Sequence, residues 1–164
     1  MMDVGQFRTL VVRPILQYLT LHSPAAENLL IGTALQESGL IWLSQHPTGP
    51  ARGVYQIEPA THADLYATWI PATVQDARRR ELRQRLVALC APAPSPVDQL
   101  RTNLAYATAV ARLLYYRHPD PLPAADDVDG LAAYYKCIFN STEGAATSEQ
   151  WAAKYRRWGQ PTES

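Results

Sequence analysis

Cysteine is scarce in this sequence, with only Cys90 and Cys137 among its 164 residues. Two cysteines define neither a disulfide framework nor a metal site, and we interpret both as small core residues. The four histidines are scattered and form no ligand-like pair on one predicted helix face, which argues against a structural zinc ion. We therefore expect neither a metal nor a cofactor.

The sequence also lacks an excess of charge of either sign, since fifteen acidic side chains balance fifteen basic ones. No long-range field therefore marks the whole chain as a partner of nucleic acid or of an anionic membrane. Five arginines fall within residues 78–85, but they are interleaved with Asp76 and Glu81 and include no aromatic neighbour. A solvated helix face explains them more simply than a nucleic-acid site does, so we expect no nucleic-acid partner.

Long apolar runs are missing as well. No segment is long and apolar enough to span a bilayer, and the first residues lack the basic start and apolar run of a secretory signal peptide. We expect no membrane insertion and no signal peptide. A chain of this length buries roughly 70% of its unfolded surface when it folds as one domain, so we predict a single domain over residues 1–164.

Apolar residues recur at helical spacing along most of the chain, and alternating strand patterns are absent. This predicts a mainly α fold with little or no β-sheet. Helices are expected over residues 7–19 with a kink at Pro14, 24–38, 61–69, 75–89, 95–114, 127–137 and 147–158. Residues 41–58 hold glycines and prolines and are expected to form a loop with at most a short hairpin.

Residues 29–40 are almost wholly apolar but carry one carboxylate, Glu37. A helix that is apolar all round belongs in a core, where an ionised carboxylate is costly. Burial and the negative end of the helix dipole both favour the protonated form, so we predict a raised pKa for Glu37. Ala26, Leu30 and Thr33 share its helix face and are expected to floor a cleft. The alternative is that Glu37 simply extends into solvent at a frayed helix end.

A carboxyl that keeps its proton near neutral pH is what glycoside cleavage requires of its general acid. The Glu-Ser pair at residues 37–38, followed after one loop by Gly-Val-Tyr-Gln-Ile-Glu-Pro-Ala-Thr at residues 53–61, resembles the lysozyme-like lytic transglycosylases of the goose-type lysozyme superfamily. The match covers the first third of the chain well and the rest loosely. It implies a lysozyme-like fold and Glu37 as the catalytic acid.

Several other residues of these two segments are candidates for binding substrate. Ser38 and Gln56 are expected to orient a sugar through hydrogen bonds. Gly53 either lets the backbone approach a ligand closely or makes an ordinary turn, and Tyr55 either stacks on a sugar ring or fills the core. Glu58 is either a surface residue or a second carboxylate, which in an inverting hydrolase activates water about 6.5–9.5 Å from the acid.

The family ends its core with Ala-Tyr-Asn-x-Gly, and two placements of this motif compete. Residues 133–135 keep the tyrosine but lack the asparagine, whereas residues 139–144 keep Asn140 and Gly144 but begin with phenylalanine. The ending from residue 135 to residue 144 resembles phage-borne members, which favours Asn140 as the asparagine of the cleft. Tyr134 is a further substrate-binding candidate, and which tyrosine supports the acid stays open.

The resemblance implies that the substrate is the glycan strand of peptidoglycan and that the β-1,4 linkage between N-acetylmuramic acid and N-acetylglucosamine is cleaved. A lytic transglycosylase needs one carboxyl, which matches the single convincing acid. A hydrolytic muramidase using Glu58, or a virion structural or glycan-binding module with little activity, are the alternatives. A cell-wall enzyme without an export signal suggests a bacteriophage protein, carried in the virion or delivered from the host cytoplasm, which leaves other virion proteins as candidate partners.

Overall fold

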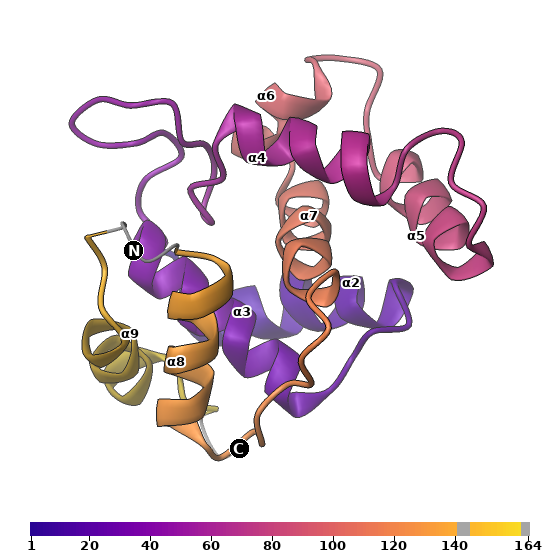
Figure 1. Ribbon diagram of the computed structural model, residues 1–164. Helices are drawn as coiled ribbons and strands as arrows, with labels where there is room; N and C mark the ends of the chain where they lie inside the picture. The colour runs from indigo at the N-terminus through magenta and orange to yellow at the C-terminus, as the bar shows by residue number, and fades with distance from the viewer. Residues whose placement is uncertain (141–144, 162–164) are drawn as a thin grey trace.

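The computed structural model describes residues 1–140 and 145–161 (Figure 1). Helices make up almost all of its regular structure, and within these residues the strand-like pairing is limited to isolated bridges of Arg52 with Ser44 and with Ile57. The elements are α1 Val4–Gln6, η1 Phe7–Val12, α2 Arg13–Tyr18, α3 Pro24–Glu37, α4 Pro59–Asp64, η2 Leu65–Trp69, α5 Ala77–Ala88, α6 Pro96–Thr102, α7 Leu104–Tyr116, α8 Val128–Ile138, α9 Ser148–Lys154 and η3 Tyr155–Gly159. The prediction of a mainly α single domain is confirmed.

Helix α7 runs between two groups of helices (Figure 1). It packs on α5 and α6 on one side and on α2 and α3 on the other, and α8 and α9 complete the second group by packing on α3. Every side chain from Tyr106 to Tyr115 is buried, which is the pattern of a helix enclosed on all sides. The core of the domain therefore surrounds α7 and its neighbour α3.

Helix α3 is enclosed in the same way, with all residues from Ala25 to Leu35 buried. It begins where the sequence predicts, because the Ser23 side chain accepts a hydrogen bond from the Ala26 N–H and Pro24 occupies the first turn. At Gly32 a Cβ would lie only 2.0 Å from the Trp151 ring. The missing side chain lets α9 pack directly onto α3.

Glu27 near the start of α3 is buried. It pairs with the buried Arg8 at 2.9 Å and with the more exposed Arg13 at 2.9 Å and His22 at 3.0 Å. Burial alone would raise the pKa of this carboxyl, but the hydrogen bonds from Arg13, Arg8 and His22 outweigh burial and lower the pKa to about 2. The cluster joins α3 to the N-terminal helices.

Three details of the expected fold are wrong. The helix expected over residues 95–114 is interrupted at Asn103, whose side chain accepts from the Tyr106 N–H and so starts α7 as a separate helix. The helix expected from Thr61 already begins at Pro59, because proline suits the first turn. Cys137 is exposed and Cys90 is only partly buried, so neither is a fully buried core residue.

We expect Glu27→Gln to lower the free energy of unfolding by about 3–5 kcal/mol, because it leaves the buried Arg8 without its countercharge. Urea unfolding at neutral pH measures this loss. In the wild type the contribution of Glu27 is fully present above its unfolded pKa of about 4.3 and is lost as the pH falls through about 2. Glu81→Gln, which breaks exposed pairs on α5, is the control, and an equal loss in both variants would contradict the prediction.

Candidate active site

The chain turns sharply where α3 ends, because Gly39 and Leu40 have φ angles of +60° and +54°. Ser38 holds this turn in place. Its hydroxyl donates to the Val54 carbonyl at 2.7 Å and accepts from the Leu40 N–H at 3.1 Å, and the residue is only 4% exposed. Ser38 borders the site as predicted, but its hydroxyl is used to join the helix end to the following loop and is not directed at a ligand.

Glu37 is the last residue of α3 and is only partly exposed. The Tyr135 hydroxyl of α8 donates a hydrogen bond of 2.5 Å to its Oε1 atom. Burial raises the pKa of Glu37, while the hydrogen bonds from Tyr135 and Asn140 and the charge of Lys154 reduce that rise without cancelling it. The raised pKa predicted for Glu37 is confirmed, and burial is its main cause.

A cavity of about 700 Å³ opens at Glu37. It lies between the end of α3, the loop from residue 41 to residue 58, and side chains that follow α8 or belong to α9. The residues that line it are Gln36, Glu37, Ser38, Gly39, Ile41, Trp42, Gln45, His46, Ala51, Gln56, Glu58, Asn140 and Lys154. Most of them are polar, which suits a ligand rich in hydroxyl and amide groups.

Trp42 and His46 form an aromatic wall of this cavity. Their rings stack in parallel, with centroids 4.2 Å apart and an interplanar angle of 3°, and Trp42 is 45% exposed. A tryptophan held flat at the edge of a polar cavity is a good surface for stacking a sugar ring. The sequence analysis predicted neither residue as part of the site. A tryptophan in a loop rich in glycine and proline could have indicated an exposed aromatic surface there.

Four of the predicted substrate-binding residues line the cavity: Ser38, Gln56, Glu58 and Asn140. Gln56 has a φ of +47°, and its side-chain amide donates to the Gly53 carbonyl at 2.8 Å. Glu58 is exposed at the start of α4. Asn140 accepts a 3.0 Å hydrogen bond from Lys136 and, through its contact with Glu37, belongs to the acid's immediate surroundings. Gly144, the glycine of the same proposed motif, lies outside the described residues.

Gly53 and Tyr55 do not line the cavity, so their assignment to substrate binding is wrong and the alternatives, a turn at Gly53 and a core position for Tyr55, are the ones observed. A Cβ on Gly53, whose φ is +74°, would lie 1.9 Å from the Leu100 carbonyl oxygen, so the glycine serves the contact between the loop and α6. Tyr55 is fully buried, and its hydroxyl lies 3.2 Å from that of Thr108 on α7. Both residues anchor the loop to the core, and Val54 between them is buried as well.

The face of α3 that was expected to floor the cleft is also buried in the core. Ala26, Leu30 and Thr33 have no exposed surface, and the Thr33 hydroxyl lies 2.7 Å from that of Tyr115 on α7. The α7 helix covers this face, so only the last turn of α3 reaches the cavity.

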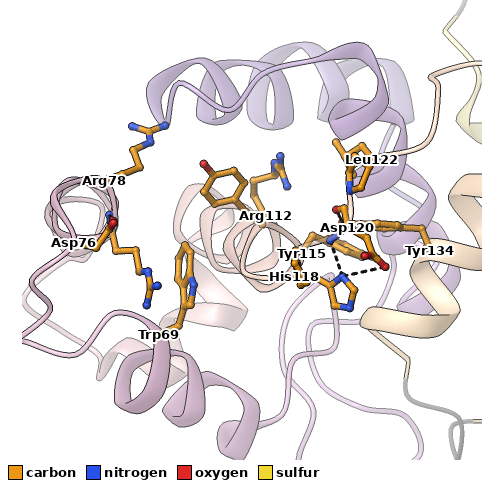
Figure 2. A pocket seen from close by; sticks show the side chains of 13 residues that line it. Trp69, Asp76, Arg78, Arg112, Tyr115, His118, Asp120, Leu122 and Tyr134 are labelled. Atoms are coloured by element: carbon orange, nitrogen blue, oxygen red, sulfur yellow. Dashed lines mark hydrogen bonds and ion pairs between the residues drawn. The ribbon is translucent and has the colours of Figure 1, made fainter.

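Tyr134 is wrong as a residue of this site, and its neighbour Tyr135 takes the expected place. Successive residues on a helix point about 100° apart, so Tyr134 borders a second cavity while Tyr135 is fully buried and points its hydroxyl at Glu37. The Tyr134 hydroxyl donates to the Asp120 carbonyl at 3.0 Å, in this second cavity, which is shown in Figure 2. Lys154, which donates to the Gln36 carbonyl at 3.2 Å, is another site residue that sequence reasoning missed, because α9 is distant in the chain.

No protein-family model, curated protein or solved structure matches this chain. The resemblance to lytic transglycosylases therefore stays a prediction based on the motifs. In the part of the chain that the structure describes, no three His, Cys, Asp or Glu side chains gather in a way that could hold a metal ion. None of the helices in these residues has the length and apolarity to cross a membrane.

We expect Glu37→Gln to stabilise the protein more at pH 7 than at pH 4. The pKa of Glu37 is raised in the folded state. As the pH rises above the unfolded pKa of about 4.3, the folded state therefore keeps a proton that the unfolded state has lost. Wild-type stability falls as the pH rises above that value. The glutamine carries no such penalty and can still accept from Tyr135. Urea unfolding at both pH values measures the difference, and a difference that does not change with pH would refute the prediction.

We expect Tyr135→Phe to raise the pKa of Glu37 further, because the hydroxyl donates to the carboxyl and favours its ionised form. Carbon-13 NMR titration of the glutamate carboxyls follows this pKa directly. Tyr134→Phe is the matched control, since it removes a phenol hydroxyl from the preceding residue, which borders the second cavity and not the Glu37 site. Equal shifts in the two variants would argue against a specific Tyr135–Glu37 interaction.

Proposed function

We propose that this protein cleaves the β-1,4 linkage between N-acetylmuramic acid and N-acetylglucosamine in peptidoglycan, and that Glu37 is its general acid. The observation that carries the proposal is a partly buried carboxyl with a raised pKa, at the edge of a polar cavity of about 700 Å³. Such a group can donate a proton near neutral pH, as departure of a sugar oxygen requires. The mainly α architecture is compatible with the lysozyme-like fold that the motifs imply.

In the first step, protonated Glu37 transfers its proton to the bridging oxygen while the bond from that oxygen to the muramoyl carbon breaks. Positive charge develops on the sugar ring as the leaving sugar departs. The transfer leaves Glu37 ionised, and the Tyr135 hydroxyl, 2.5 Å from Oε1, stabilises the new carboxylate. Burial and the nearby Glu37 charge raise the pKa of Tyr135, so it stays a proton donor throughout.

In the second step, ionised Glu37 removes the proton from the six-hydroxyl of the same muramoyl ring. That oxygen then bonds to the positively charged carbon, which gives an anhydromuramoyl end without the entry of water. Glu37 returns to its protonated form, so a single carboxyl completes the cycle. Asn140 and Tyr135, which contact that carboxyl, hold it in position, while Trp42 and His46 offer a surface for a sugar ring.

Hydrolysis is the second candidate, and the position of Glu58 favours it. Glu58 lines the same cavity as Glu37 and is exposed to solvent. A second carboxylate across a cleft can activate water for attack on the opposite face of the sugar. The product would then carry a reducing end in place of the anhydro end.

Mass analysis of soluble products from purified peptidoglycan tests both candidates. We expect anhydro ends from the wild type and from Glu58→Gln, and a loss of roughly 10²- to 10⁴-fold in Glu37→Gln, because that variant lacks the acid. Reducing ends that disappear in both variants would identify a hydrolase that uses Glu58. If the wild type releases nothing from several wall types, the enzyme proposal fails and a glycan-binding or virion assembly role replaces it.

A further inference from the structure

A second cavity, of about 520 Å³, lies between the start of α5, η2 and the C-terminal end of α7 (Figure 2). The proposed function does not use it. Its walls include the rings of Trp69, Tyr115, Tyr116 and Tyr134. Aromatic walls of this kind favour a ligand that carries a ring or another apolar group.

Arg112 of α7 is buried at this cavity, with only 6% of its surface exposed. Within residues 1–140 and 145–161 its guanidinium takes part in none of the ion pairs, and its Nε atom is buried without a hydrogen-bond partner. It does lie over the Tyr116 ring, 5.4 Å from the centroid. A cation–π contact is a weak compensation for a charge removed from water, and burial accordingly lowers the pKa of Arg112.

The carboxylates of the cavity have other partners. Asp76 caps α5 by accepting from the Arg79 N–H at 2.8 Å, and Asp120 lies 3.7 Å from His118. Figure 2 shows Arg112 between these two groups, with Asp76 and Trp69 on one side and His118 and Asp120 on the other.

The other arginines of the cavity lie on α5. Arg79 stacks over Trp69 at 5.7 Å from the ring centroid, while Arg78 is bound by Glu81 at 2.9 Å. The lining therefore contains more cationic than anionic side chains, and no carboxylate among the described residues forms an ion pair with the buried Arg112.

We propose that this cavity binds an oxyanion, a carboxylate or a phosphate group, through the guanidinium of Arg112. The planar fork of arginine matches two oxygens of either group, and a bound anion supplies the charge that the buried cation lacks. The remainder of the ligand that carries the anion packs against the aromatic side chains of the cavity. This inference does not depend on the cleavage of peptidoglycan.

A series of stacked aromatic rings connects the second cavity to Glu37. Tyr115, which lines the second cavity, stacks on Phe139 at 5.2 Å, and Phe139 stacks on Tyr135 at 6.3 Å. Tyr135 in turn contacts Glu37. A ligand in the second cavity is thus separated from the acid by a few packed side chains.

Two-dimensional NMR of the full chain tests the proposal with three probes at constant ionic strength: benzoate, its neutral counterpart benzamide, and inorganic phosphate. We expect saturable shifts of the Trp69 indole and Arg112 guanidinium signals with benzoate, with phosphate, or with both, and none with benzamide. Benzoate alone assigns a carboxylate site and phosphate alone a phosphate site. Equal binding of benzamide, or no saturable shift with any probe, overturns the proposal.

Arg112→Met is the central variant, because methionine keeps much of the side-chain volume and removes the charge. We expect anion affinity to fall roughly 10- to 100-fold, as for the loss of a charge-assisted hydrogen bond. Without anion we expect the melting temperature to rise by about 2–4 °C, because an unpaired buried charge is removed. A lower melting temperature or a failure to fold means that Arg112 is a structural residue and overturns the proposal.

Two further variants separate this site from other effects. Arg79→Met, on the exposed opposite wall, is expected to weaken benzoate or phosphate binding without loss of folding. Arg156→Met, at a distant surface pair with Asp129, is the matched control and is expected to bind like the wild type. Glu37→Gln is also expected to bind normally, so a failure of the proposed cleavage activity leaves this test intact. Weaker binding in Arg156→Met would indicate a general charge effect and contradict the site.

Discussion

The enclosure of α3 on all sides is the constraint on which the rest of the structure depends. Because water cannot reach most of this helix, each of its polar groups needs a partner within the protein. Glu27 at one end has two arginines and a histidine, and its pKa falls to about 2. Glu37 at the other end has a hydroxyl, an amide and one more remote lysine, and its pKa is raised. The same residue type on one helix thus becomes a structural anion at one end and a candidate acid at the other.

The loop after α3 shows how packing separates scaffold residues from site residues. Gly53 and Tyr55 anchor it to α6 and α7, and Ser38 joins it to the end of α3. With these contacts fixed, Trp42, Gln56 and Glu58 are left facing the cavity. A motif can therefore be continuous in sequence while only part of it contacts a ligand, because the other residues hold that part in place.

Aromatic rings fill the space between the second cavity and the acid. Tyr134 and Tyr135 are adjacent in α8, yet Tyr134 borders the cavity that holds Arg112 and Tyr135 donates to Glu37. Tyr115 and Phe139 fill the space between them.

The sequence by itself determined the mainly helical architecture, the enclosed α3 helix and the raised pKa of Glu37, because hydrophobic periodicity, capping residues and a lone acid in an apolar run are local properties. It also indicated Ser38, Gln56, Glu58 and Asn140 as residues that line the cavity. Only the tertiary structure decided that Tyr135 and not Tyr134 contacts the acid, that Gly53 and Tyr55 are scaffold, and that Lys154 and Trp42 join the site. Those outcomes depend on which helix covers which face, and a contact between residues about a hundred positions apart leaves no local pattern in the chain.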